Sequence, residues 1–524
     1  MPMPKFIPYN YDQSTMIVIN FNDQLQPGTF EYAVHHLVDN KLDLSVFYPN
    51  YQNENGGRPA YDPALLLKII LFAYSKGITS SREIQWCCET NILFKALSCD
   101  SVPHFTTIAA FVSERTNEIE TLFEQILLVC DEQGLLGKEL FAIDGCKMPS
   151  DASKEWSGTL KELEQKRDKI KRQIRHHIRE HQRLDNAESR EEEQLQRKQQ
   201  AIDTLNKAYE KIDNFLKSAS PRMGQGKRPR EVKSNITDNE SCKMTTSKGT
   251  IQGYNGVATV DKKHQIIIDA QAFGEGQEHH VLQPVLENVK DRFQRLGISD
   301  DIYKTGVIVT ADTGYANEDN MGYLFNSNID GYIPDNQFRS RDPKFTEQKL
   351  KYGKRNQHVK KTKTNVLPAT DFLFDPIAKT CTCPAGEALW LKHESEDQNK
   401  NKKFFFEGRL SKCRNCKLKR QCMRNPESAN HRKGNGRQVS FIINKGDERP
   451  KYTEWMKQRI DSEKGKEIYS HRMSVVEPVF ANVGSNKRLN RFSLRSQKKV
   501  QGQWQLYCMF HNIEKIANYG RIAA

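Results

Sequence analysis

Residues 139–147, ELFAIDGCK, decide the fold, because a short apolar run in this stretch ends in an acid. The stretch predicts a strand over residues 139–147 that carries Asp144, the acid that ends its apolar run. The stretch VIVTADTGYANEDN at 307–320 repeats this pattern with Asp312. A carboxylate at the end of a buried strand costs free energy unless another charge offsets it. Two such acids, joined by Glu477 from a helical stretch, therefore indicate a divalent-metal site for phosphodiester chemistry.

Strand and helix signals alternate around these acids. The segments 251–260 and 265–272 are typical of strands, and the DKKH between them predicts a hairpin. A helix is expected at 280–295, before the strand that delivers Asp312. This order predicts an α/β fold with a mixed sheet flanked by helices.

The N-terminal part of the chain is typical of a helical domain. Asp62 can cap a helix that has Pro63 in its first turn, apolar residues at helical spacing and a stop at Gly77. Further helices are expected between residues 80 and 133. Such a domain is either purely structural or binds DNA through a helix-turn-helix, and the pattern leaves both open.

A highly charged segment at 157–217 interrupts the α/β pattern. Its apolar residues recur at spacings of three, four and seven, which predicts two long amphipathic helices with a turn at 186–189. The resulting hairpin is either an arm that packs on the body or on a second copy, or an arm that binds DNA or mediates dimerisation. A basic linker follows at 218–235. Trp156, just before the hairpin, fits core packing as well as stacking on a base.

Five of the twelve cysteines cluster between Cys381 and Cys422. Cys413 and Cys416 have the spacing at which two thiolates reach one Zn²⁺. Cys422 and Cys383 would complete a four-thiolate site, and Cys381 is the alternative ligand. Since protein ligands would fill all four positions, we expect a structural zinc; free thiols in a loop-rich insertion are the alternative.

The net charge of the 524-residue chain is +14, with basic residues clustered along its whole length. This charge points to a polyanionic partner, first nucleic acid and second an anionic membrane surface. The sequence shows neither a signal peptide nor a run long enough to span a bilayer, so we expect a cytosolic protein.

The chain resembles the DDE transposases of bacterial insertion sequences, enzymes with an RNase H-like catalytic core. Five stretches carry the resemblance: GRPAYDPALLLKIILFAYSKGITSSREI (57–84), AIDGCKM (142–148), IQGYNGVATVDKKHQIIIDAQ (251–271), VTADTGYANEDN (309–320) and GQWQLYCMFHNIEKI (502–516). The resemblance implies a catalytic triad of Asp144, Asp312 and Glu477 that would hold Mg²⁺ or Mn²⁺. A cysteine-rich insertion before the glutamate is also a feature of such enzymes.

The surroundings of Glu477 depart from the pattern of many relatives, Tyr-x2-Arg-x3-Glu-x6-Lys. Tyr469 and Arg472 match its start, but Glu477 comes one residue late and position 484 is Gly. Lys487 is the nearest lysine. The resemblance implies that Tyr469, Arg472 and Lys487 support the site or contact DNA phosphates.

The activity implied is cleavage at transposon ends followed by strand transfer into target DNA. The expected partners are the terminal repeats and the target, and a homodimer or larger assembly is expected because two ends must meet. A DNA-binding protein of transposase ancestry that no longer cuts, a nuclease without strand transfer and a scaffolding protein are the alternatives.

The expected domain organisation combines these segments: a helical, DNA-binding domain at 1–135, the start of the catalytic core at 136–156, the helical hairpin at 157–217, the core continued at 218–334, a basic cysteine-rich insertion at 335–465 and the end of the core at 466–524.

Overall fold

The structure of the protein is a computed structural model. It describes residues 18–51, 56, 59–185, 192–224, 229–345, 366–396, 401–432, 434–443 and 452–522, so the predicted turn at 186–189 lies outside the described residues. The chain forms two compact units, Met1–Phe338 with Tyr452–Ala524, and Arg339–Lys451. None of the helices in the described ranges is long and apolar enough to cross a membrane.

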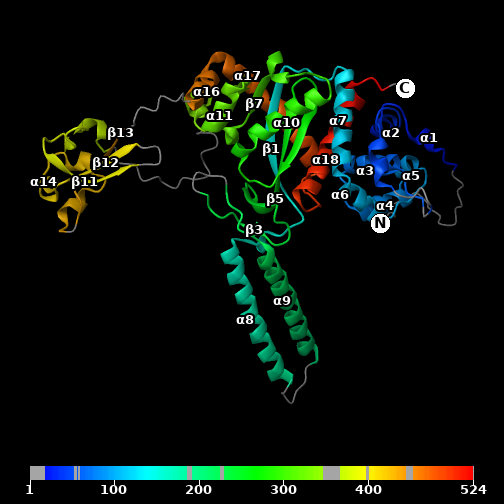
Figure 1. The fold of residues 1–524 in the computed structure, drawn as a ribbon, viewed down its shortest axis with the longest axis horizontal. Coiled ribbons are helices and arrows are strands. Elements are labelled where there is room, and N and C mark those ends of the chain that lie inside the picture. The colour runs from blue at the N-terminus through cyan, green and yellow to red at the C-terminus, as the bar shows by residue number, and fades with distance from the viewer. Residues whose placement is uncertain are drawn as a thin grey trace, which may run out of the picture. The chain divides into compact units, whose positions relative to one another are not determined.

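The first unit begins with a bundle of helices (Figure 1). Their bounds are α1 Phe21–Gln24, α2 Phe30–Asn40, α3 Pro63–Ser75, α4 Ser81–Thr90, α5 Ile92–Ser98, α6 Phe105–Glu114 and α7 Thr116–Glu132. The carboxylate of Asp62 caps α3 by accepting a hydrogen bond from the backbone N–H of Ala64 at 2.7 Å. Most side chains of α3 are buried, which explains why its sequence is apolar on nearly every face.

A mixed sheet forms the centre of this unit. Its strands are β1 Leu140–Pro149, β4 Cys242–Thr246, β5 Gly249–Asp261, β6 Ile267–Phe273, β7 Ile308–Ala311 and β8 Asp330–Tyr332. The order is β4-β5-β1-β7-β8, and β6 also pairs with β5. β1 and β5 are antiparallel, as are β5 and β6, whereas β1, β7 and β8 run parallel. The predicted mixed α/β fold is thereby confirmed.

Helices from distant parts of the chain pack around the sheet. They are α10 Leu282–Arg295, α11 Glu318–Asn326, α16 Tyr452–Asp461, α17 Glu463–Phe480 and α18 Gln497–Tyr519. α18 contacts β6 and also α7, α2 and α6, so it joins the N-terminal bundle to the sheet. One continuous apolar core results from this packing.

The helical hairpin enters between β1 and β4. It consists of α8 Leu160–Asp185 and α9 Glu192–Ser218, which lie side by side (Figure 1). The short strands β2 Ser157–Gly158 and β3 Ser234–Asn235 pair with each other and close its base. Trp156 packs against the hairpin's own apolar cluster, and the ammonium groups of Lys166 and Lys211 lie over its ring, 4.4 and 5.3 Å from the centroid.

The second unit contains an antiparallel sheet of its own. Its strands are β9 Leu373–Asp375, β10 Thr380–Thr382, β11 Ala388–Glu396, β12 Lys402–Gly408 and β13 Gln438–Ile443, in the order β13-β12-β11-β10-β9. Two short helices, α14 Leu410–Arg414 and α15 Lys419–Cys422, follow β12. A small core with Phe404 and Phe406 holds this unit together.

Candidate active site

Asp144 and Asp312 lie beside each other where the parallel pairing of β1 with β7 ends. The register pairs Ile143 of β1 with Ala311 of β7. Asp144 is the next residue within β1, which continues to Pro149, and Asp312 directly follows β7. Asp144 Oδ1 accepts a hydrogen bond from the backbone N–H of Gly145 at 2.8 Å. Asp312 Oδ1 accepts one from the N–H of Gly314 at 2.7 Å. Each of the two carboxylates therefore accepts a hydrogen bond from a nearby backbone N–H.

Arg472 of α17 is the cation that offsets Asp144. Its Nη2 lies 2.7 Å from Asp144 Oδ2, and its side chain is only 7% exposed. Burial raises the pKa of Asp144, while Arg472 and the Gly145 N–H oppose this effect. Asp312 and Glu477 raise the pKa of Asp144 further by repulsion, so both acids lie close enough for their fields to reach it.

Glu477 is exposed on α17 near Asp144, on the same helix as Arg472. The structure therefore brings the three predicted acids to one region of the first unit. The three predicted supporting residues differ in what they contact. Arg472 binds Asp144, but Tyr469 packs edge-on against Phe338 and Lys487 Nζ lies 2.6 Å from Glu514 Oε1 of α18.

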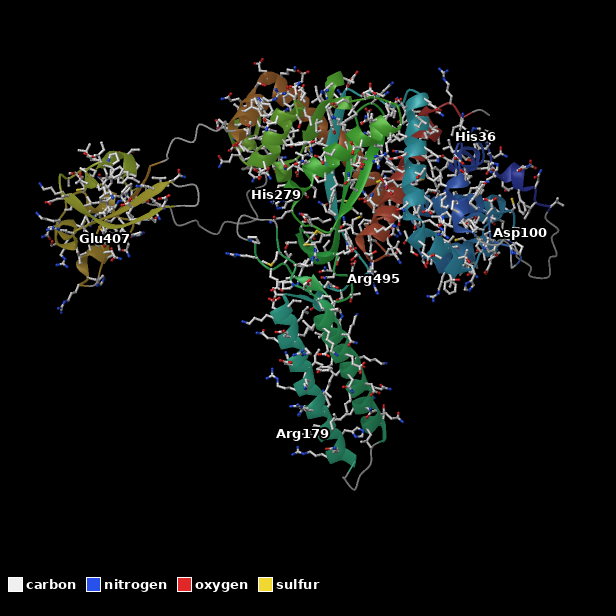
Figure 2. The ribbon with its side chains drawn as sticks, viewed as in Figure 1. His36, Asp100, Arg179, His279, Glu407 and Arg495 are labelled. Carbon is white, nitrogen blue, oxygen red and sulfur yellow. The ribbon has the colours of Figure 1, made fainter. Side chains whose placement is uncertain are left out.

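A fourth acid, Glu278, faces the same region and was missed by the sequence analysis. It begins the short 3-10 helix Glu278–His280, just before His279 (Figure 2), and its side chain is 15% exposed. Burial, then repulsion from Asp312, raise the pKa of Glu278 to about 7, although Lys147 opposes them. Lys147 Nζ lies 3.9 Å from Glu278 Oε1. The topology explains its position: β6 runs parallel to β1, so the residues after β6 emerge on the same side of the sheet. No pattern in the sequence marks Glu278.

Glycine lets Glu278 approach the edge of the sheet. A Cβ on Gly314 would lie 2.2 Å from Glu278 Oε2, so any other residue there would displace the carboxylate. Gly145 plays the same part for Asn255, whose Oδ1 would lie 2.7 Å from an added Cβ. Both glycines therefore allow polar side chains to pack beside the two aspartates.

Buried polar atoms without partners surround the acids. The hydroxyl of Tyr315 and both amide atoms of Asn255 have no hydrogen-bond partner among the described residues. Burial, then repulsion from Glu278, raise the pKa of Tyr315 well above its usual value, so this hydroxyl stays protonated. Buried polar groups in proteins are almost always paired, so these atoms have room for hydrogen bonds to ordered water or to a polar ligand.

The donor set of this edge fits a hard divalent cation, because its candidate ligands are carboxylate oxygens. Within the described ranges, no three or more His, Cys, Asp or Glu side chains are grouped closely enough to hold a metal ion. Mg²⁺ commonly uses only one or two carboxylates and takes its other ligands from water and substrate phosphates. Asp144 and Asp312 would be those two carboxylates.

The predicted zinc ligands lie together in the second unit. Cys383, Cys413, Cys416 and Cys422 all line one pocket of about 580 Å³ and are free thiols. Burial, with repulsion from neighbouring thiols, raises the pKa of Cys413 and Cys422. Cys381 is instead buried in the sheet of that unit. Thiolates are common zinc ligands, so the four residues fit zinc chemically. Their sulfur atoms would have to move closer together when the ion binds.

Two transposase family models match the chain. The model described as Transposase DDE domain matches residues 382–517, and the model described as Transposase domain (DUF772) matches residues 19–114. The search of curated proteins found no match. These matches indicate that the protein is a DNA transposase.

The protein is a DDE transposase of insertion-sequence type with an RNase H-like fold, as the resemblance implied. The matched ranges contain Glu477 and the four clustered cysteines. Asp144 and Asp312 lie outside both ranges. Their assignment therefore depends on the sequence pattern and on the geometry of the sheet.

Proposed function

We propose that the protein is an active, metal-dependent transposase that cleaves phosphodiester bonds at transposon ends and joins the freed 3′ ends to target DNA. Asp144, Asp312 and Glu477 would be its catalytic acids. The observation that carries this proposal is that Asp144 and Asp312 lie beside each other where the parallel pairing of β1 with β7 ends. Since two transposon ends must be joined in one reaction, the working form would be at least a dimer on DNA.

Each protein group has a distinct part in this reaction. When bound, divalent ions would activate the attacking oxygen and stabilise the leaving one. Asp144 and Asp312 would hold them, and Glu477 would approach from α17. Arg472 opposes the rise in the pKa of Asp144 and fixes the orientation of its carboxylate. Phosphoryl transfer requires mainly such positioning and charge stabilisation, so the protein needs no covalent nucleophile.

Substitution of the aspartates tests the proposal. We expect Asp144→Asn and Asp312→Asn to abolish cleavage of a labelled transposon end in Mg²⁺ while leaving DNA binding nearly unchanged. Asp131→Asn is the matched control, because Asp131 pairs with Lys138 at the end of α7 and is not near the site. Normal strand transfer by either site variant would refute the assignment. Cleavage without joining by the unchanged protein would instead identify a nuclease, and binding alone an inactive relative.

We also propose one structural zinc ion at Cys383, Cys413, Cys416 and Cys422. The support is that all four thiols line one pocket beside α14 and α15. Metal analysis under reducing conditions should find about one zinc per chain, and Cys413→Ser with Cys416→Ser should lose it. Cys99→Ser, at an exposed thiol in the first unit, should keep it. Purified protein free of zinc would contradict the proposal.

A further inference from the structure

The outer face of α8 carries an unbroken basic stripe. Residues 169–179, KIKRQIRHHIR, contain five Lys or Arg, two His and no acid. Four cations of this segment, Lys169, Arg172, Arg175 and Arg179, lie on the side opposite the buried Ile170 and Ile174, and all four are exposed. Arg179 lies towards the C-terminal end of the helix (Figure 2). We call these four residues the α8 stripe.

The α8 stripe is not neutralised by the rest of the hairpin. In the described part of the chain, none of its four cations forms a salt bridge, and Arg172 Nε only reaches the carbonyl of Asp168 on its own helix, at 3.4 Å. By contrast, the α9 cations Arg197 and Lys217 pair with Glu193 and Asp213. Nine Lys or Arg against five Asp or Glu give α8 a charge of +4, whereas five against five leave α9 neutral.

The apolar faces of the two helices are already used. Leu163, Ile170 and Ile174 of α8 pack with Ile212 of α9 in one buried cluster. Among the described residues of the hairpin, Ile178 is the one large apolar side chain that is exposed, at 40%. A coiled-coil seam for a second copy needs a continuous apolar stripe, and the described residues of this hairpin leave none exposed. The surface that remains is charged, so it complements a polyanion.

We infer that the α8 stripe is a binding surface for the phosphate backbone of duplex DNA. This inference rests on the proposed transposase function and assigns the hairpin a part in it. The eleven residues of 169–179 rise about 16 Å along the helix. Over that length, duplex DNA carries about nine phosphates. The contacts are to phosphates, so binding is independent of base sequence. They extend the contact between protein and DNA beyond the active site.

Two variants that remove equal charge test the inference. The stripe variant combines Arg172→Gln, Arg175→Gln and Arg179→Gln. The control combines Arg197→Gln, Lys207→Gln and Lys217→Gln on α9, where two of the three cations are already paired. Affinity of the full-length proteins for a duplex several helical turns long is measured over a range of salt concentrations, and thermal unfolding shows that both variants remain folded.

Loss of three phosphate contacts should make the slope of log affinity against log salt shallower by about 2.7 in the stripe variant. Between about 50 and 200 mM salt, affinity of the unchanged protein should therefore fall about 40-fold more than affinity of the stripe variant. The control should keep the slope of the unchanged protein.

Other outcomes separate the inference from the proposed function. Equal slopes for the stripe variant and the control would overturn the inference and leave the transposase function standing. Absence of DNA binding by the unchanged protein would overturn both. Loss of binding to anionic lipid vesicles by the stripe variant, with DNA binding unchanged, would assign the surface to a membrane and would also overturn the inference.

Discussion

At the residue scale, the site is defined by how it balances charge. Asp144, Asp312, Glu477 and Glu278 bring four carboxylates to one region, and Arg472 supplies a buried cation for them. Breaking a buried ion pair leaves an uncompensated charge, so Arg472 is as necessary to the resting protein as to the reaction. A bound divalent ion would add to the positive charge that Arg472 and Lys147 supply.

Glu278 gives the sharpest prediction at this scale. We expect Glu278→Gln to lower cleavage at least about tenfold and to raise the Mg²⁺ concentration needed for half-maximal activity, because it removes one carboxylate beside Asp312. DNA binding should persist. Glu287→Gln, at an exposed position of α10, should change neither quantity. A Glu278→Gln protein with unchanged activity and unchanged metal dependence would show that the Glu278 side chain has only a packing role.

At the element scale, the hairpin is a small folding unit with its own core. Ile212 of α9 is completely buried against α8, and its truncation to Ala should cost about 3 kcal/mol of local stability. We expect faster amide exchange and faster proteolysis confined to α8 and α9, with the sheet unaffected. Ile178→Ala, at a 40% exposed position, is the control and should have little effect. Exchange that accelerates equally in β1 would mean that the hairpin does not unfold by itself.

The elements also show what the sequence could predict. The apolar runs before Asp144 and Asp312 predicted strands, because a buried strand of a parallel pair must be apolar. The heptad-like spacing predicted α8 and α9. Glu278 could not be found from such a pattern, because its position depends on a hairpin that returns β6 parallel to β1 and on the glycine at position 314. Lys487 was expected to support the site, but the structure pairs it with Glu514.

At the scale of the whole molecule, buried ionic and polar contacts tie distant segments together. Arg292 of α10 has no exposed surface and contacts Asp269 of β6 as well as Glu120 and Glu124 of α7. This network links the N-terminal bundle directly to the sheet. The hairpin enters between β1 and β4, and the second unit enters between β8 and α16. Both insertions therefore leave the strand pairing of β1 with β7 intact.

The buried imidazole of His511 in α18 makes the stability of this first unit depend on pH. His511 Nε2 lies 3.0 Å from the Gln265 carbonyl, and its Nδ1 lies 3.1 Å from the Asn482 side-chain nitrogen. A neutral ring that donates through Nε2 and accepts at Nδ1 satisfies both contacts. Burial is the main reason that the pKa of His511 is lowered to about 4, and nearby Lys515 and Lys487 add to this effect while Glu514 opposes it.

The unfolded chain has a histidine pKa of about 6.5. Between about pH 6.5 and 4, His511 is therefore protonated in the unfolded chain but neutral in the folded protein. The contribution of His511 to stability is therefore complete above about pH 6.5, and about 3 kcal/mol is lost as the pH falls through this window. Urea unfolding of the protein and of His511→Gln at matched pH values measures the effect. The variant should be less stable at pH 7.5 but should lose less stability on acidification. Parallel pH profiles for the two proteins would show that folding does not shift the pKa of His511.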